Sequence, residues 1–318
     1  MTTALAILRR LGKIVLILLL ISFFTFLLMT LLPGDPARVI AGELATPEQV
    51  QAVREQLNLD APLLERYGDW LGDAMHGDLG RSLQTGVPVW TSIKEALPVT
   101  LELAIGGLLF ALVLAVPIGV YAGYRPGSLF DRAVSLFTSA TLAFPVFLVA
   151  IMLVYVLAVN WQVFPVTGWS RLSDGVGDNF NYAFLPIVSL ALTEMVVFIR
   201  LLRSDIAATL QQDFILAARA RGLSTPRILF GHALRPSAFS LTTVLGVALG
   251  RLIGGAVLVE VIFALPGLGQ LAVNAIATRD YTIVQGVVLF VAVVYVLLNT
   301  LVDLAYPLLD PRVRVRTA

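Results

Sequence analysis

Six long apolar stretches, separated by polar segments, dominate the pattern of this chain of 318 residues. A helix needs about 20 mostly apolar residues to cross the hydrocarbon core of a bilayer, which is about 30 Å thick. Each stretch is close to that length or longer. The pattern therefore predicts an all-α membrane protein with six transmembrane helices. Their predicted ranges are 14–32, 99–124, 133–159, 184–203, 237–263 and 282–306.

The basic side chains are distributed unevenly between the two sides of such a bundle. With the N-terminus inside, the cytoplasmic segments hold 14 arginines and lysines, whereas the outer segments hold 7. Short loops rich in these residues stay on the cytoplasmic side of a membrane. We therefore expect a multi-pass protein whose two terminal segments, residues 1–13 and 307–318, are both cytoplasmic.

The outer segment between the first two predicted spans, residues 33–98, is too long for a plain connection, and we call it the cap. In the stretch 46–49, a threonine, a proline and a glutamine have the spacing of an N-cap, a first-turn proline and a capping-box partner. Pro62 predicts the start of a second helix, which Gly77 would end. The small helical cap is interpreted either as a structural lid or as a docking surface for an extracellular partner.

The segment between the fourth and fifth predicted spans, residues 204–236, carries the signals of two short helices. Ser204 and Asp205 can cap a first helix that continues to Arg221. Gly222 then supplies the left-handed residue with which many helices end.

A second helix is expected at residues 226–234, and Pro236 should prevent its continuation. The residues alone leave two interpretations of the whole 204–236 segment. It is either a rigid helix–glycine–helix unit that transmits a push from a cytoplasmic machine, or an amphipathic surface helix that binds acidic lipid head groups.

The composition agrees with a membrane protein, because 58% of the residues are hydrophobic and only 14% are charged, against about 25% charged in soluble proteins. A net charge of +1 gives no basic surface for nucleic acid. The chain has no cysteine and two histidines far apart in sequence, so no metal site is expected. Its only lysines, Lys13 and Lys94, follow no phosphate-binding glycine pattern. We therefore expect no bound cofactor, no catalytic residue and no ATPase on this chain.

Ionisable residues inside predicted spans suggest function, because burying a charge in lipid is unfavourable. Counting about 1.5 Å per residue places Glu194 and Arg251 at a similar depth near the middle of the membrane. We hypothesise that they form an ion pair or face a water-filled cavity, where opposite charges would suit a peptide. The alternative is a structural pair that touches no substrate. Glu260 and Glu102 lie near the outer ends of their spans and are expected to be exposed to water.

The fifth predicted span carries glycines every four residues, at Gly246, Gly250 and Gly254. This spacing places three small residues on one helix face and allows a second helix to approach closely. The face could pack within this chain's own bundle, or it could face a partner subunit or a translocation path.

Several short motifs follow one another along most of the chain. They are Leu32-Pro33-Gly34-Asp35-Pro36, Gly77-Asp78-Leu79-Gly80, Ala217-Ala218 with Gly222, His232-Ala233-Leu234-Arg235, Pro266-Gly267-Leu268-Gly269, Arg279-Asp280-Tyr281 and Leu309-Asp310-Pro311-Arg312. Together they resemble the dipeptide, oligopeptide and nickel branch of the ABC importer permeases. The alanines with Gly222 look like the EAA loop of that family, although Leu216 replaces its glutamate and the following proline is delayed to Pro236.

The resemblance implies a type I, MetI-like permease fold in a bacterial cytoplasmic membrane. It implies a heterodimer with a second permease subunit, two ATPase subunits or one heterodimeric ATPase pair that carry ATP and Mg, an extracytoplasmic substrate-binding protein, and surrounding lipid. The long cap is similar to that of the B-type permease in such pairs. The residues expected to contact the ATPase are Asp213, Ala217, Ala218, Arg221, Gly222, Leu223, His232, Leu234 and Arg235.

The expected function is therefore import of short peptides by alternating access. Relatives also carry nickel complexes and glutathione-like molecules, so these stay open as alternative cargo. A secondary transporter driven by an ion gradient, and a membrane anchor without a path, are the competing classes.

Overall fold

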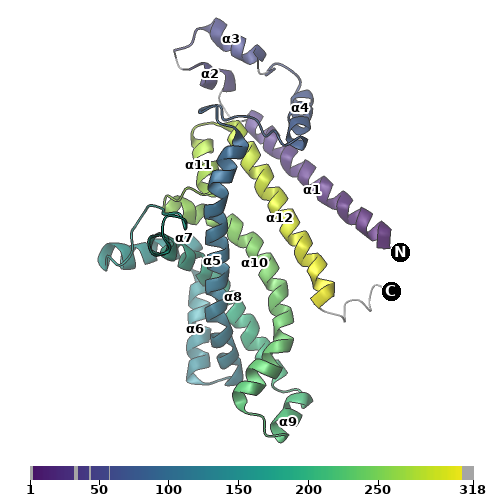
Figure 1. The fold of residues 1–318 in the computed structure, drawn as a ribbon, viewed down its shortest axis with the longest axis vertical. Helices are drawn as coiled ribbons and strands as arrows, with labels where there is room; N and C mark the ends of the chain where they lie inside the picture. The colour runs from purple at the N-terminus through teal and green to yellow at the C-terminus, as the bar shows by residue number, and fades with distance from the viewer. Residues whose placement is uncertain (1–2, 32–34, 43, 57, 310–318) are drawn as a thin grey trace. The chain divides into compact units, whose positions relative to one another are not determined.

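The computed structural model describes residues 3–31, 35–42, 44–56 and 58–309. These ranges are largely helical (Figure 1), with one isolated β-bridge between Arg81 and Pro88. By its internal contacts the chain divides into unit 1, residues 1–98 and 266–297, and unit 2, residues 99–265 and 298–318. The predicted C-terminal segment lies outside the described residues from position 310 onward, as do residues 32–34 at the junction of the first span and the cap.

The helices begin and end as follows. The first five are α1 (Thr3–Leu31), α2 (Pro36–Ala41), α3 (Pro47–Gln56), α4 (Leu63–Met75) and α5 (Val89–Tyr124). Next come α6 (Leu129–Ala143), α7 (Val146–Leu153), the π-helical η1 (Val154–Asn160), α8 (Val176–Thr209), α9 (Asp213–Ala220) and the π-helical η2 (Arg227–Ala233). The last three are α10 (Leu234–Ile262), α11 (Leu268–Ala277) and α12 (Tyr281–Leu309).

Helices long and apolar enough to cross a membrane occur at five of the six predicted places within the described ranges. They are Gly12–Leu31, Val89–Tyr124, Val176–Thr209, Ser240–Ile262 and Tyr281–Val302. The sixth predicted place holds two helices that would make one span together. The described part of the chain therefore has the all-α, multi-span architecture that the apolar pattern predicts.

The prediction of one continuous helix at 133–159 is wrong. The chain breaks between α6 and α7, whose axes differ by 105° (Figure 1). Phe144 takes an extended conformation, with φ −100° and ψ 131°, directly before Pro145. Proline excludes the helical conformation at the preceding residue and lacks the N–H that would continue the ladder. The proline therefore divides an apolar stretch whose hydropathy alone suggests one span.

In unit 1 the cap contains the two predicted helices, α3 and α4, and also α2, which the sequence analysis did not assign. The capping box is present: the Thr46 N–H donates to Gln49 Oε1 at 2.9 Å, and the Gln49 N–H donates to Thr46 Oγ1 at 3.4 Å. Asp35 caps α2 by accepting the N–H of Ala37 at 3.1 Å. Local capping chemistry thus fixes where these short helices begin.

Aromatic packing joins α4 to α1 within the same unit. Tyr67 lies edge-on to Phe23 and Phe26, with ring centroids 5.3 and 5.6 Å apart, and Trp70 lies next to Phe26 at 6.0 Å. The Tyr67 hydroxyl is also 2.8 Å from the hydroxyl of Ser22 in the middle of α1. Such pairs add to the apolar burial of the rings, so α4 packs on the apolar helix.

Asp280 connects the cap to α12 in unit 1. Its carboxylate accepts hydrogen bonds from the Ser82 hydroxyl and from the Leu83 N–H, the latter at 3.1 Å. The same carboxylate faces the N–H of Ile283 in the first turn of α12. Asp280 is only 4% exposed, so the charged acceptor is almost fully enclosed by these donors, as a buried carboxylate requires.

Unit 2 is built around α8, the most buried of its long helices, which packs against α10, α6 and α7. Its core contains Phe198, Ile199 and Leu202, which are fully buried. Glycines allow the C-terminal part of α5 to approach α8 closely. A Cβ at Gly123 would lie 2.6 Å from the carbonyl oxygen of Arg203. Small residues here permit an approach that larger side chains would block.

Three predicted boundaries move. The second span begins at Val89 rather than at residue 99, so α5 includes ten residues that were assigned to the cap. Ser204 and Asp205 lie inside α8, which continues to Thr209, and therefore cap no helix. Pro236 lies two residues after the junction of the π-helical η2 with α10, and it does not end the helix.

Candidate functional site: the 204–236 segment and the ion pair of α8 and α10

The 204–236 segment turns sharply at Gly222. The N–H of Gly222 donates to the carbonyl of Arg219 at 2.9 Å, and the N–H of Leu223 donates to the carbonyl of Ala218 at 3.3 Å. These two bonds form a Schellman motif that closes the C-terminus of α9. Gly222 has a φ of +74°, in the left-handed region that disfavours residues with a Cβ. The predicted glycine stop is therefore confirmed.

One face of α9 is anchored. Ile215 is fully buried and Ala218 is 7% exposed, and both belong to a cluster with residues of α5, α8 and η2. The cluster contains Val120, Ile206, Ile215, Ala218, Ile228, Leu229 and Ala233. Because η2 and α10 follow each other without a break, this cluster ties α9 to three long helices of unit 2. A displacement of α9 would therefore move packed side chains rather than a slack loop.

The other face of α9 is exposed and mixed in character. Phe214 is 47% exposed, Leu216 is 54% exposed, and on η2 Phe230 is 54% exposed. Large apolar side chains grouped on a surface mark a site for a partner or for a membrane. Sequence reasoning did not select these three residues as contacts, although large apolar side chains in a segment outside the predicted spans are a signal that could have identified them.

The predicted contact residues fall into two groups. Asp213, Ala217, Arg221, Gly222, His232 and Arg235 are exposed, whereas Ala218 is buried and Leu223 and Leu234 are partly buried. The structure thus places Ala218, Leu223 and Leu234 under the surface, where they hold α9 in place. The exposed group shares its surface with Phe214, Leu216 and Phe230. Both a protein partner and a lipid surface remain compatible with this composition.

An ion pair joins α8 to α10, as hypothesised. Arg251 Nε lies 3.1 Å from Glu194 Oε1, and Arg251 Nη2 lies 2.7 Å from Glu194 Oε2. This two-bond geometry is the strong form of the arginine–carboxylate contact. The two partners differ in burial, since the Glu194 side chain is 6% exposed and the Arg251 side chain is 47% exposed. The guanidinium therefore binds a buried carboxylate while about half of the Arg251 side chain stays exposed.

A second pair, which the sequence analysis missed, joins α8 to α6. Arg203 binds Asp131 through both Nε and Nη2, the latter at 2.8 Å. Arg200, one turn earlier, donates to the hydroxyls of Thr138 at 3.3 Å and Ser139 at 2.9 Å. No sequence spacing relates positions 62 to 72 residues apart, so these contacts emerge only from the packing of α6 on α8.

The expectation that Glu260 is exposed to water is wrong. Its side chain is completely buried, and the Thr100 hydroxyl donates to Glu260 Oε1 at 2.6 Å. Thr100 of α5 thus contacts this end of α10, which a count of depth along one helix cannot foresee. Glu102, two residues further along α5, is partly exposed.

The glycines of α10 do not share one environment. A Cβ at Gly246 would come within 2.2 Å of Val302 on α12, so this glycine serves close packing inside unit 2. Gly250 is buried as well, whereas Gly254 is exposed and has nothing within 4 Å of its Cβ position. The two interpretations of the glycine face therefore apply to different glycines: the first two pack internally, and Gly254 is open.

Two family profiles cover most of the chain. The profile described as "Binding-protein-dependent transport system inner membrane component" matches residues 115–315. A second, for the N-terminal part of the same kind of membrane component, matches residues 4–104.

Curated relatives match over nearly their whole length. A probable peptide ABC transporter permease of Sinorhizobium fredii is 38% identical over 308 residues, covering 97% of this chain and 98% of the relative. A putative peptide transport system permease of Brucella melitensis is 41% identical, covering 99% of both chains. The dipeptide transport system permease protein DppB of Escherichia coli is 35% identical, covering 97% of this chain and 98% of DppB.

Among solved structures, an inward-facing MetNI methionine ABC transporter is similar to this chain with a TM-score of 0.54. The alignment covers 69% of this chain and 96% of that chain at 18% sequence identity. It supports the MetI-like fold that the sequence motifs imply. The family profiles and the relatives lead to one conclusion: the chain belongs to the inner membrane components, or permeases, of binding-protein-dependent ABC transport systems.

Proposed function

We propose that this chain is the permease subunit of an ATP-driven importer that moves short peptides across the bacterial cytoplasmic membrane. The peptide cargo is supported by relatives at 35–41% identity whose names describe peptide or dipeptide transport. The single structural observation that carries the proposal is the 204–236 segment, where α9 has one face anchored on three long helices and the other face exposed.

In this proposal both termini are cytoplasmic, and the exposed face of α9 docks on an ATPase. Two ATPase subunits, or one heterodimeric pair, would bind ATP and Mg and do the hydrolysis, while this chain does no bond chemistry. Their closure would push α9, and the cluster around Ile215 would pass the movement to α5, α8 and α10. The Glu194–Arg251 pair joins α8 to α10, so the same movement would displace the two residues. A second permease subunit and an extracytoplasmic binding protein would complete the importer.

The proposal is tested by uptake of a radiolabelled dipeptide into proteoliposomes that contain the assembled transporter. Uptake should require ATP and binding protein, and should persist when ionophores collapse the proton and sodium gradients. Uptake that continues without ATP but stops with the ionophores would instead identify a secondary transporter. No ATP-driven uptake of the dipeptide, by a transporter that does take up labelled nickel complex or glutathione, would overturn the peptide assignment while keeping the importer.

Two glycines of the 204–236 segment offer a matched pair of variants for the coupling step. Gly222→Ala places a Cβ at φ +74°, where an L-residue loses about 1 to 2 kcal/mol. Gly231→Ala adds the same atom in a helical conformation with open space around it. We expect Gly222→Ala to reduce ATP-driven uptake several-fold and Gly231→Ala to leave it unchanged. Equal effects of the two variants would count against the turn as a rigid coupling element.

A further inference from the structure

Unit 1 contains a hollow of about 350 Å³ that none of the roles above requires. This volume falls in the range of small-molecule sites, about 300 to 1,000 Å³. Its wall combines apolar and polar side chains from α1, the cap and α12. The residues that matter below are Phe26, Met29, Leu59, Arg66, Tyr281 and Gln285.

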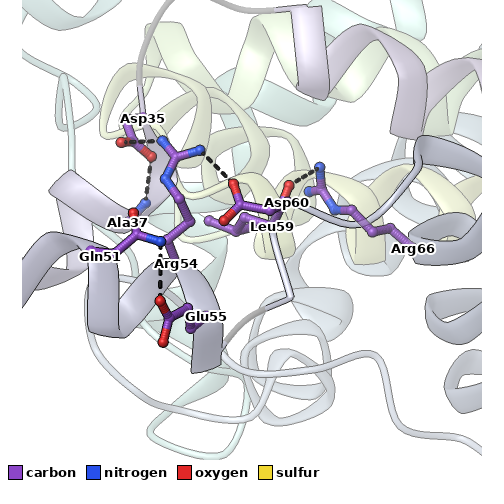
Figure 2. A network of polar contacts seen from close by, with 8 residues as sticks. All are labelled: Asp35, Ala37, Gln51, Arg54, Glu55, Leu59, Asp60 and Arg66. Carbon is purple, nitrogen blue, oxygen red and sulfur yellow. Dashed lines mark hydrogen bonds and ion pairs between the residues drawn. The ribbon is translucent and has the colours of Figure 1, made fainter.

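The two arginines on this wall differ in how their charges are satisfied. Arg54 donates to Asp35 Oδ2 at 2.6 Å and to Asp60 Oδ1 at 3.1 Å (Figure 2). These bonds to carboxylates raise the pKa of the Arg54 guanidinium. Both oxygens of Asp35 are occupied, since the second accepts the N–H of Ala37. Arg54 and Asp35 therefore form a closed network that offers the hollow little net charge.

Arg66 has no such partner. Its guanidinium makes a long hydrogen bond of 3.5 Å to the Leu59 carbonyl and lies 5.7 Å from the Phe26 ring centroid (Figure 2 shows the first contact). Within the described ranges no acidic side chain lies within 4.0 Å of it. Partial burial lowers the pKa of Arg66, only partly opposed by the more distant charge of Asp60. A partly desolvated cation without a carboxylate is a site that attracts an anion.

Tyr281, another residue that lines the hollow, carries an unsatisfied hydroxyl. Tyr281 is 8% exposed, and its buried hydroxyl oxygen has no hydrogen-bond partner among the described residues. Gln285, one helical turn further on α12, is also 8% exposed. Buried polar groups are nearly always hydrogen-bonded in folded proteins, so an orphan hydroxyl on a residue that lines the same hollow as an unpaired cation suggests a group that is supplied from outside the chain.

We propose that this hollow binds a small organic carboxylate with an apolar body. The carboxylate pairs with the Arg66 guanidinium, and a small rotation of the Tyr281 side chain lets its hydroxyl donate a second hydrogen bond. The apolar body lies against Phe26, Met29 and Leu59. A phosphate dianion fits less well, because one unpaired guanidinium supplies a single positive charge and the carboxylates of Asp35 and Asp60 are close by. In this proposal no carboxylate of the wall is assigned to a ligand amine, so the ligand does not need a free amino group.

The test is calorimetric titration of the full-length chain in nanodiscs of zwitterionic phosphatidylcholine. N-acetyl-leucine is the probe, and N-acetyl-leucinamide, which lacks the carboxylate, is its matched control. We expect saturable binding of the acid and at least about tenfold weaker binding of the amide, as for the loss of a charge-assisted hydrogen bond. Equal binding of acid and amide, or no binding of either, would overturn the proposal.

Variants separate the site from general charge effects. Arg66→Gln should weaken binding of the acid at least about tenfold, and Tyr281→Phe should weaken it a few-fold. Arg38→Gln changes an exposed cap arginine that does not line the hollow, and it should leave binding unchanged. Thermal unfolding of each variant checks that the cap is folded; because Tyr281→Phe keeps the ring, it remains informative if Arg66→Gln is unstable. Unchanged binding in both Arg66→Gln and Tyr281→Phe would contradict the assignment.

A lipid-derived acid and a water-soluble acid share this chemistry. Titration with decanoate distinguishes them: tighter binding of decanoate than of N-acetyl-leucine, lost in Arg66→Gln, would identify fatty acids as the source. A preference for N-acetyl-leucine would identify a soluble carboxylate. The site stands apart from the proposed transport function, because binding is measured on this chain alone without ATP or uptake.

Discussion

The unequal burial of Glu194 and Arg251 predicts that the two single variants have unequal effects on stability. Arg251→Met leaves a carboxylate that is 6% exposed without its partner. Removing one partner of a buried ion pair costs about 3 to 5 kcal/mol, because the remaining charge is left uncompensated.

Glu194→Gln leaves a guanidinium that is already 47% exposed. This cation can be hydrated, and the glutamine carbonyl can still accept one of its hydrogen bonds, so the loss should be about 1 to 2 kcal/mol. The double variant, which combines Glu194→Gln with Arg251→Met, should have about the same free energy of unfolding as Glu194→Gln alone, because it leaves no carboxylate buried without a partner. Arg251→Met alone should therefore be less stable than the double variant by about 2 kcal/mol at pH 7.

The assay is unfolding by sodium dodecyl sulfate in mixed micelles at pH 7. Arg200→Met serves as the control, because Arg200 is an exposed arginine of α8 that donates to the neutral hydroxyls of Thr138 and Ser139, and its loss should cost under about 1 kcal/mol. Additive effects of the two single variants, or a larger effect of Glu194→Gln than of Arg251→Met, would refute the reasoning from burial.

Three further predictions concern packing and caps. Gly246→Ala should destabilise the protein by about 1 to 3 kcal/mol because its Cβ meets Val302, and Val302→Ala should restore most of this loss in thermal unfolding; no rescue would contradict the contact. Asp280→Asn should speed hydrogen exchange at residues 82–86, because it removes the charged acceptor of the Ser82 hydroxyl. A hydrogen bond to a charged group contributes about 1.5 to 3 kcal/mol to stability. Thr46→Ala should cost about 1 kcal/mol and speed exchange in the first turn of α3 but not in α4; uniform exchange in both helices would argue against the capping box.

Local chemistry made much of the fold predictable from the sequence. The capping box at Thr46, the proline start of α4 at Pro62 and the left-handed stop at Gly222 depend on neighbours within a few residues, and all three appear in the structure. The depth estimate that brought Glu194 and Arg251 together also succeeded, because both helices are long and the rise per residue is constant.

Two of the failures arose because tertiary packing decided the outcome. The buried state of Glu260 depends on Thr100, and the pair of Arg203 depends on Asp131. The break at Pro145 was hidden because hydropathy is indifferent to backbone breaks. The short helix α11 was missed, since a stretch of ten mostly apolar residues between two turns is compatible with several structures.

The most direct test of the coupling role is cross-linking from the exposed face of α9 in a chain that has no cysteine of its own. A thiol-to-amine cross-linker would be applied to the assembled complex with the Ala217→Cys variant and with Ala52→Cys, an exposed cap position, as the control. We expect Ala217→Cys to cross-link to an ATPase subunit with a yield that changes when ATP is added, and Ala52→Cys not to cross-link to it. No ATPase cross-link from Ala217→Cys in an intact complex, with or without nucleotide, would contradict the assignment of α9 as the coupling helix.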